Sequence, residues 1–353
     1  MAPKLKKVTL KYGFPIFTKN ESTSYIVRNE KLRVSDIWSF WDYIIRMHGK
    51  HQDELKFLLS LLEQARYFYD TAEQAPVKSQ PLLFYYSFLN LAKIVINIAN
   101  YTGIASEYNH GIETSVTHQT NLSNAEIKIK SLAGGSKISV CNQFFRSMEN
   151  PLNFVANTPY QLMIKDCLQS CIGIHRTFSE TFNEDETYYR IVNSELIKTG
   201  KELCFECEIH PCDNSIMELL NNHGYSIYIS EGKYKWRETI MMKTYSVTRK
   251  DYYDLSQKIK NKGIWYYTDG NEYRMYISSN RSLALSPESL IYSTMFFFGS
   301  ITRYHPYLFD SLLSKKELWL VDEFLRTQPK QFLYLVTSRV IGQGIFKSRT
   351  SNI

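Results

Sequence analysis

Residues 75–111 have the sequence APVKSQPLLFYYSFLNLAKIVINIANYTGIASEYNHG, and this stretch decides the fold. From Pro81 to Ala99 nearly every residue is apolar. The few polar residues recur every three or four positions, which places them in one narrow stripe on a helix; they are Ser87, Asn90, Lys93 and Asn97. A helix that is apolar almost all round is buried, so the sequence predicts a core helix here.

The same helix is almost long enough to cross a membrane, which is the alternative to a core position. A membrane span needs about 20 mainly apolar residues. Asn90, Lys93 and Asn97 would each be costly in lipid, so a core helix is favoured and no membrane partner is expected. Ser79 is expected to cap the first turn, and Gly103 follows the last turn.

Composition indicates an ordinary globular protein, and its positive net charge weakly favours an acidic partner. The chain has 353 residues, of which 44% are hydrophobic and 22% charged, so it is long enough for two domains. Its net charge is +7 and its aromatic content 14%, which favours a nucleic acid or nucleotide as partner. The opening MAPKLKKVTL lacks the apolar segment of a signal peptide, so we expect a cytoplasmic protein with reduced cysteines.

The pattern of apolar residues changes along the chain and predicts the domains. Residues 35–114 and 286–345 have helical periodicity, whereas residues 115–285 read mainly as strands with helical pieces between them. The sequence therefore predicts an α+β protein in which a discontinuous helical bundle holds an inserted, sheet-rich α+β domain. Residues 1–34 are expected to form a basic arm with short strands, and residues 346–353 a polar tail.

Capping residues predict where several helices begin and end. One helix is expected to begin at Ser35 and end at Gly49, and Ser286 and Pro306 are expected to begin two helices near the C-terminus. Gly342 should end the last helix. The other helices are expected at residues 53–72, 159–174, 215–222, 251–261, 317–326 and 331–341. Strands are expected at residues 8–12, 25–27, 127–129, 137–140, 188–192, 203–209, 225–229, 235–242, 264–267 and 273–277.

Two segments carry a family resemblance. Residues 65–96, ARYFYDTAEQAPVKSQPLLFYYSFLNLAKIVI, with NHG at residues 109–111, resemble the signature of the YaaC-like family of bacterial proteins. Residues 292–313, YSTMFFFGSITRYHPYLFDSLL, resemble a second part of it, and residues 160–178, YQLMIKDCLQSCIGIHRTF, lie where that family has a similar helix. The resemblance covers residues 50–345 and implies a family without implying an activity.

The helical part is also similar in style to HEPN domains, small bundles that often cleave RNA with an Arg and a His in the pattern R-x4-6-H. Arg46 and His51 match this pattern. Gly49 should end the helix between them and separate their directions. The sequence therefore favours a basic cluster at a helix end over a catalytic pair.

A cluster of cysteines offers a possible metal site. Cys204, Cys207, His210 and Cys212 have the chemistry that tetrahedral zinc prefers. In a strand over residues 203–209, however, Cys204 and Cys207 point to opposite faces, and no second CxxC completes a zinc ribbon. Buried thiols are favoured over zinc, which stays the alternative, and neither a metal nor a cofactor is expected. P-loop, nucleophile-elbow and zincin motifs are absent from the sequence.

Polar residues in the apolar helices are the candidate site. A buried charge must be paired or bind something, so these residues form either a structural network or a cleft for phosphate or nucleic acid. The two apolar helices should share one core, which brings the polar groups near their C-terminal ends together. The candidate ligand-binding residues are Arg303, His305, His110, Lys93, Arg66 and Asn90.

Three functions stay open at this point. The first is a nucleic-acid-binding component of a bacterial anti-phage defence or RNA-processing system, either an active HEPN-type ribonuclease or an inactive relative. The second is a non-enzymatic interaction subunit whose inserted sheet binds a protein partner. The third is a nucleotide-binding sensor or enzyme. The sequence leaves open whether the protein is an enzyme at all.

Overall fold

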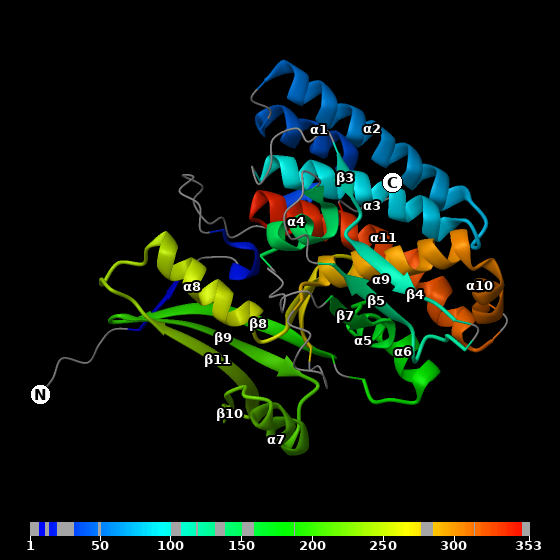
Figure 1. Ribbon diagram of the computed structural model, residues 1–353. Coiled ribbons are helices and arrows are strands. Elements are labelled where there is room, and N and C mark those ends of the chain that lie inside the picture. Colours follow the sequence, from blue (N-terminus) through cyan, green and yellow to red (C-terminus); the bar gives the residue numbers. More distant parts are fainter. Residues whose placement is uncertain are drawn as a thin grey trace, which may run out of the picture. The chain divides into compact units, whose positions relative to one another are not determined.

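The computed structural model (Figure 1) describes residues 7–10, 14–19, 32–48, 51–99, 107–117, 119–130, 138–149, 159–186, 188–276, 285–313 and 315–347. The strand expected at residues 25–27 and the helix ends expected at Gly49 and Gly103 lie outside these residues. Within them, helices and several sheets confirm the predicted α+β class. The HEPN-like character of the helices stays a prediction.

The chain divides into two compact units, each made of segments far apart in sequence. We call them the sheet unit and the helical unit. The sheet unit contains Met1–Arg33, Thr187–Ala284 and Thr337–Ile353, and the helical unit contains Val34–Glu186 and Leu285–Val336.

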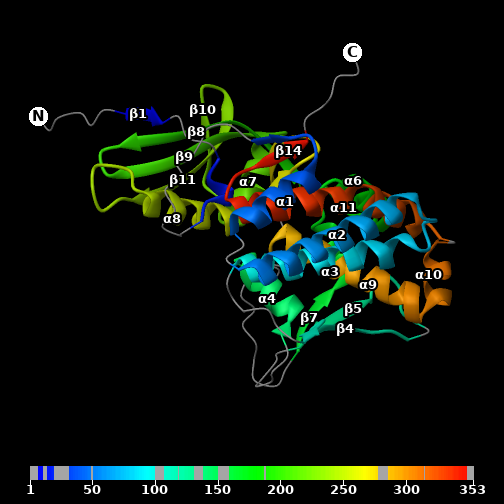
Figure 2. The ribbon, with the colours of Figure 1, turned by 90° about the horizontal axis from the view of Figure 1, so that it is seen from above.

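The helical unit is built on two long neighbouring helices, α2 and α3, with α9 packed against α3 (Figures 1 and 2). Its helices are α1 (Ile37–His48), α2 (Gln52–Gln74), α3 (Gln80–Ile98), α4 (Val140–Ser147), α5 (Ile164–Gln169), α6 (His175–Phe182), α9 (Pro287–Tyr304), α10 (Pro306–Leu313) and α11 (Glu317–Ile341) up to Val336. A small antiparallel sheet has the order β4 (Ile112–Ser115), β5 (Glu126–Ile129) and β7 (Tyr160–Met163). The short strands β3 (Tyr108–Asn109) and β6 (Ile138–Ser139) pair in parallel.

Helix α3 lies in the core of this unit, as its apolar sequence predicts. Phe88 is fully buried and stacks on Phe332 of α11, with ring centroids 3.9 Å apart. The polar residues Ser87 and Asn97 of α3 are buried as well. Among the described residues α3 is the helix long and apolar enough to cross a membrane, and 72% of that window is buried within the protein.

The sheet unit is an antiparallel sheet with one face covered by α8 (Arg249–Lys260). The strand order is β10 (Ile227–Ser230), β11 (Lys233–Met241), β9 (Glu202–His210), β8 (Tyr188–Thr199), β13 (Glu272–Tyr276) and β12 (Ile264–Tyr267), and β1 (Lys7–Leu10) also pairs with β8. The remaining elements are η1 (Pro15–Phe17), α7 (Asn214–Asn222) and the paired strands β2 (Leu32–Val34) and β14 (Ile345–Lys347).

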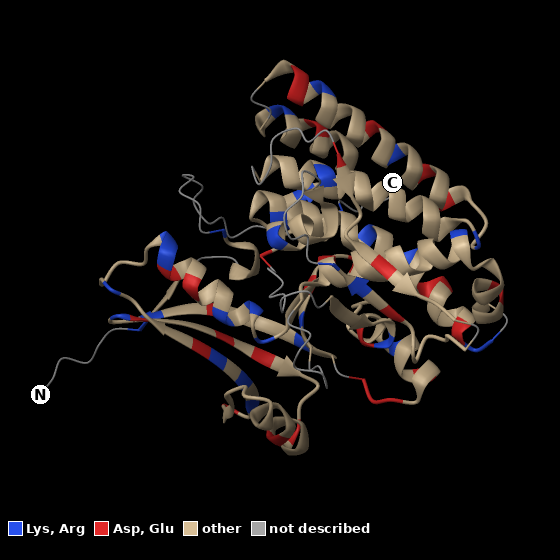
Figure 3. Ribbon diagram, viewed as in Figure 1, with Lys and Arg blue, Asp and Glu red and all other residues tan. Residues whose placement is uncertain are grey.

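The two faces of this sheet differ because side chains alternate along a strand. On β9 the apolar residues Leu203, Phe205 and Ile209 are buried, and Phe205 packs edge-on against Trp236 of β11. The residues between them, among them Glu206 and Glu208, carry charge and pair with basic residues of β11. Figure 3 shows acidic and basic segments side by side on these two strands.

The compact units have boundaries that differ from the predicted insertion of residues 115–285. Residues 115–186 belong to the helical unit, because β5 buries Ile127 and Ile129 there. The side-chain amide of Gln328 on α11 also donates to the carbonyl of Ile172 at 2.7 Å. A local sequence pattern does not predict such long-range contacts. The predicted polar tail likewise begins later, since β14 reaches Lys347.

Some predicted helix ends are confirmed and others are corrected. The Ser286 hydroxyl accepts the backbone N–H of Ser289, and α10 begins at Pro306, both as predicted. The cap of α1 is Asp36 rather than Ser35, since the Asp36 carboxylate accepts the backbone N–H of Trp38 at 3.0 Å. Ser79 has helical backbone angles and makes no side-chain cap.

Three predicted helices have different limits for reasons of tertiary packing. Residues 160–163 of the helix predicted over 159–174 form β7, because their backbone pairs with β5 and buries Leu162. The helices predicted at 317–326 and 331–341 are one helix, α11, which continues through Pro329. Buried apolar residues on both sides of this proline, such as Phe324 and Phe332, hold the helix together despite the missing N–H.

Candidate anion-binding site

A tight turn at Asn109-His110-Gly111 sets the position of His110. The side-chain carbonyl of Asn109 accepts the backbone N–H of Gly111 at 2.7 Å. Gly111 has a φ of 71°, and a Cβ there would lie 1.9 Å from Oγ of Ser139. Only glycine satisfies both the left-handed backbone and this close approach, so the NHG sequence is explained by local geometry.

His110 contacts the core helix through Tyr85. Its Nδ1 lies 2.5 Å from the Tyr85 hydroxyl on α3, and the two rings have centroids 5.7 Å apart. Burial raises the pKa of Tyr85, so its hydroxyl stays protonated and can donate to Nδ1. This hydrogen bond leaves Nε2 of His110 available, and the residue itself is exposed at the surface.

Arg303 reaches the same region because α9 crosses α3 closely at Gly299. A Cβ on Gly299 would lie 3.2 Å from the Pro81 carbonyl oxygen and 3.2 Å from Cβ of Tyr85. One turn later, Nη1 of Arg303 donates to the Tyr86 hydroxyl at 3.0 Å. The Arg303 guanidinium also lies 4.9 Å from the ring centroid of Tyr304.

Lys93 is the third cation, two turns along α3 from Tyr86. Its Nζ lies 5.2 Å from the ring centroid of Tyr108, a cation–π contact. The Asn97 side-chain amide donates to the Tyr108 hydroxyl at 3.2 Å and so holds the ring in place. Partial burial lowers the pKa of Lys93.

We call the three residues Lys93, His110 and Arg303 the cation cluster, because the charges of Lys93 and Arg303 both act on His110. Partial burial lowers the pKa of His110, and the positive charges of Lys93 and Arg303 lower it further. Within the described part of the chain, neither Lys93 nor Arg303 forms an ion pair with a carboxylate. Many basic residues of the helical unit do have one, including the pairs Arg46–Asp42, Lys78–Asp310, Lys130–Glu113 and Lys165–Glu184.

The other three predicted site residues do not join the cluster. Arg66 pairs with Asp70 at 3.5 Å and lines a groove of about 690 Å³ between α1 and α2. Asn90 is 5% exposed, and its amide points to Gln64 of α2 at 3.4 Å. His305 is the residue between α9 and α10, where its backbone N–H bonds to the Ile301 carbonyl at 2.9 Å.

Four tyrosines complete the cluster, and sequence reasoning did not assign them to the site: Tyr85, Tyr86, Tyr108 and Tyr304. The available signal was the YY pair in a strongly apolar helix, together with a total of 26 tyrosines. Each of these rings or hydroxyls touches one member of the cation cluster, so the site combines positive charge with aromatic surface.

The cysteines of the sheet unit are placed as the strand pattern predicts. Cys204 pairs with Thr239 and Cys207 with Trp236, so the two thiols lie on opposite faces of β9. Burial raises the pKa of both thiols. Two thiols on opposite faces of one strand cannot bind the same zinc ion, so this geometry counts against a zinc site. Among the described residues no group of three or more His, Cys, Asp or Glu side chains could hold a metal ion.

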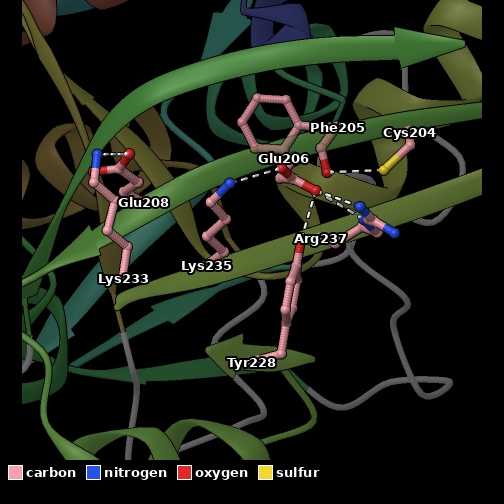
Figure 4. A network of polar contacts seen from close by, with 8 residues as sticks. All are labelled: Cys204, Phe205, Glu206, Glu208, Tyr228, Lys233, Lys235 and Arg237. Atoms are coloured by element: carbon pink, nitrogen blue, oxygen red, sulfur yellow. Dashed lines mark hydrogen bonds and ion pairs between the residues drawn. The ribbon is translucent and has the colours of Figure 1, made fainter. Parts of the chain in front are cut away.

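Glu206 is the centre of a polar network on the face of the sheet opposite to the buried side chain of Phe205 (Figure 4). Its carboxylate accepts hydrogen bonds from Tyr228 at 2.5 Å, from Lys235 at 3.3 Å and from Arg237. Burial alone would raise the pKa of Glu206, but the hydrogen bonds from Tyr228 and Arg237 outweigh burial and lower the pKa to about 2. Since each charge has a partner, the network stabilises the sheet rather than offering a site.

The possible HEPN pair is not assembled on one helix. Arg46 lies in the last turn of α1 and pairs with Asp42 at 2.6 Å, whereas His51 precedes α2 as its N-cap residue. The described residues therefore give no geometric support to a shared catalytic role for these two side chains.

The segments that carry the family resemblance include α3, the NHG turn and α9 of the helical unit. The chain belongs to the YaaC-like protein family, whose family model matches residues 21–340. The NHG turn, α3 and α9 all lie within this match. Comparison with curated proteins and with solved structures gave no match.

Proposed function

We propose that the helical unit binds nucleic acid through phosphate groups held by the cation cluster of Lys93, His110 and Arg303. The observation that carries this proposal is that the positive charges of Lys93 and Arg303 both act on His110, and neither cation has a described carboxylate to neutralise it. Holding like charges together is unfavourable, and a bound anion would remove the cost.

Phosphate suits this cluster better than a single carboxylate. A guanidinium donates two parallel hydrogen bonds, an ammonium adds a point charge, and His110 can donate from Nε2. A phosphate group has enough acceptor oxygens for all of them. The surrounding tyrosines and the net charge of +7 favour a nucleic acid over inorganic phosphate as the natural ligand.

Salt dependence of oligonucleotide binding tests the proposal. Each phosphate contact to a single strand contributes about −0.7 to the slope of log binding constant against log salt concentration. Lys93 and Arg303 together should therefore contribute about −1.4 near pH 8, where His110 is neutral. The slope is measured by fluorescence anisotropy of a labelled oligonucleotide over a range of salt concentrations.

Matched variants separate this site from general surface charge. Arg303→Gln should weaken binding and reduce the magnitude of the slope by about 0.7. Lys93→Met should have the same effect, because methionine removes the charge and has a side chain of similar length. Arg46→Gln is the control, because Arg46 is also an exposed arginine of the helical unit, 56% exposed and paired within its own helix. Equal binding by Arg303→Gln, Lys93→Met and the wild type would overturn the proposal.

A further inference from the structure

We infer that the nucleic acid bound at the cation cluster is single-stranded, with bases stacking on Tyr304 and Tyr307. This inference rests on the proposed function and adds the class of ligand. Tyr307 is 89% exposed and Tyr304 is 62% exposed, although a tyrosine gains stability by burying its ring. Both rings are therefore accessible, and Tyr304 lies beside Arg303, a cation that would hold the phosphate.

The corner between α9 and α10 places Tyr304 against Arg303 and Tyr307 in the first turn of the next helix. Helix α9 ends at Tyr304, His305 is the single residue between the helices, and α10 begins at Pro306. The Arg303 guanidinium lies over the Tyr304 ring, so phosphate and base contacts would come from adjacent residues. Tyr307 follows three positions later on the first turn of α10.

This corner is held in place by contacts on either side of it. Nη1 of Arg303 donates to the Tyr86 hydroxyl on α3 at 3.0 Å. On α10, the Asp310 carboxylate pairs with Nζ of Lys78, in the connection before α3, at 2.6 Å. The exposed rings therefore stand on fixed elements, which reduces the entropy lost when a base stacks on them.

Exposed rings distinguish a single strand from a duplex. Bases in a duplex are already stacked on one another, so an outer tyrosine can stack on them only after unstacking. Bases of a single strand have free faces, and stacking on an aromatic side chain is tolerant of sequence. Cations that hold the backbone beside rings that hold the bases are the combination that single-strand binding uses.

The test compares four labelled ligands of one sequence and length: single-stranded RNA, single-stranded DNA and the RNA and DNA duplexes. Either single strand should bind at least about tenfold more tightly than its duplex. A preference for RNA over DNA would add recognition of the 2′-hydroxyl group. Equal or tighter binding of the duplexes would overturn the inference.

Variants then connect the preference to the two rings. Tyr304→Leu combined with Tyr307→Leu should weaken single-strand binding at least about tenfold and duplex binding by clearly less. Tyr67→Leu is the matched control, because Tyr67 of α2 is also a tyrosine of the helical unit and is 63% exposed. Both substituted positions are at the surface, so the melting temperature should stay within the range of the control.

Failure of this inference is distinguishable from failure of the proposed function. If Arg303→Gln weakens binding and the double tyrosine variant does not, phosphates bind at the cluster and the stacking inference is wrong. If Arg303→Gln and Lys93→Met both bind every ligand as the wild type does, or if the wild type binds none of them, both the proposed function and this inference are overturned.

Discussion

The Tyr85 hydroxyl lies 2.5 Å from Nδ1 of His110, across 25 positions of sequence. This contact joins the buried helix α3 to the surface turn at Asn109-His110-Gly111. Tyr85 is 4% exposed, so its position is set by the core, and the histidine that contacts it is thereby fixed relative to the core. The cation cluster is thus held by the fold rather than by flexible surface side chains alone.

Gly111→Ala should destabilise the protein more than the same change at Gly232. Both glycines have a left-handed backbone, with φ of 71° and 73°, which costs a non-glycine residue about 1–2 kcal/mol. Only at Gly111 would the new Cβ also meet Ser139, since nothing lies within 4 Å at Gly232. Urea unfolding measures both variants, and equal losses of stability would show that the contact with Ser139 is unimportant.

Gly299→Val should lower stability and weaken oligonucleotide binding together. The larger side chain would push against Pro81 and Tyr85, at a cost of about 1–3 kcal/mol for overpacking, and would move Arg303 away from Tyr86. Gly299→Ala should have a smaller effect, because alanine gains about 1 kcal/mol of helix propensity. A valine variant with normal stability and normal binding would contradict the close crossing of α3 and α9.

The Glu206 network should make the sheet unit sensitive to acid. The folded pKa of about 2 is lower than the ordinary value of 4.5, so the unfolded state binds more protons in this range. The stabilisation is present above the ordinary pKa and is lost as the pH falls toward 2. Chemical denaturation at several pH values should show this loss in the wild type and a smaller one in Glu206→Gln.

Glu218→Gln is the control for this prediction. Glu218 lies on α7 of the same unit, is exposed, and forms no ion pair within the part of the chain that the structure describes. Its substitution should leave the acid sensitivity as in the wild type. The account of the network fails if Glu206→Gln and Glu218→Gln behave alike.

Local signals predicted much of the fold. Ser286 and Pro306 act within a single turn, and alternation over residues 203–209 placed Cys204 and Cys207 on opposite faces of a strand, as the register confirms. The burial of α3 followed from its composition. By contrast, the continuation of α11 through Pro329 depends on core packing that no local pattern reports.

The candidate site was predictable only in part, because it too depends on packing between distant parts of the chain. Lys93, His110 and Arg303 were recognisable as polar groups near the ends of apolar helices. The direction of a side chain depends on its place around the helix and on the partner helix. Asn90 therefore turned toward Gln64 of α2, and Arg66 toward Asp70. The tyrosines were overlooked because each reads as an ordinary core residue.

The pKa of His110, measured by NMR of histidine-labelled protein with and without ligand, tests the cation cluster most directly. The signal is assigned by its absence in His110→Gln, and the ligand is a saturating single-stranded oligonucleotide. In the free protein the pKa should be below the ordinary value of 6.5, because partial burial and the charges of Lys93 and Arg303 disfavour the imidazolium.

A phosphate bound at the cluster would stabilise the imidazolium, so saturation should raise the pKa of His110, and binding should tighten as the pH falls through this range. Inorganic pyrophosphate should raise it in the same direction. If the oligonucleotide saturates the protein and the pKa of His110 does not change, the nucleic acid binds elsewhere and the central claim is wrong.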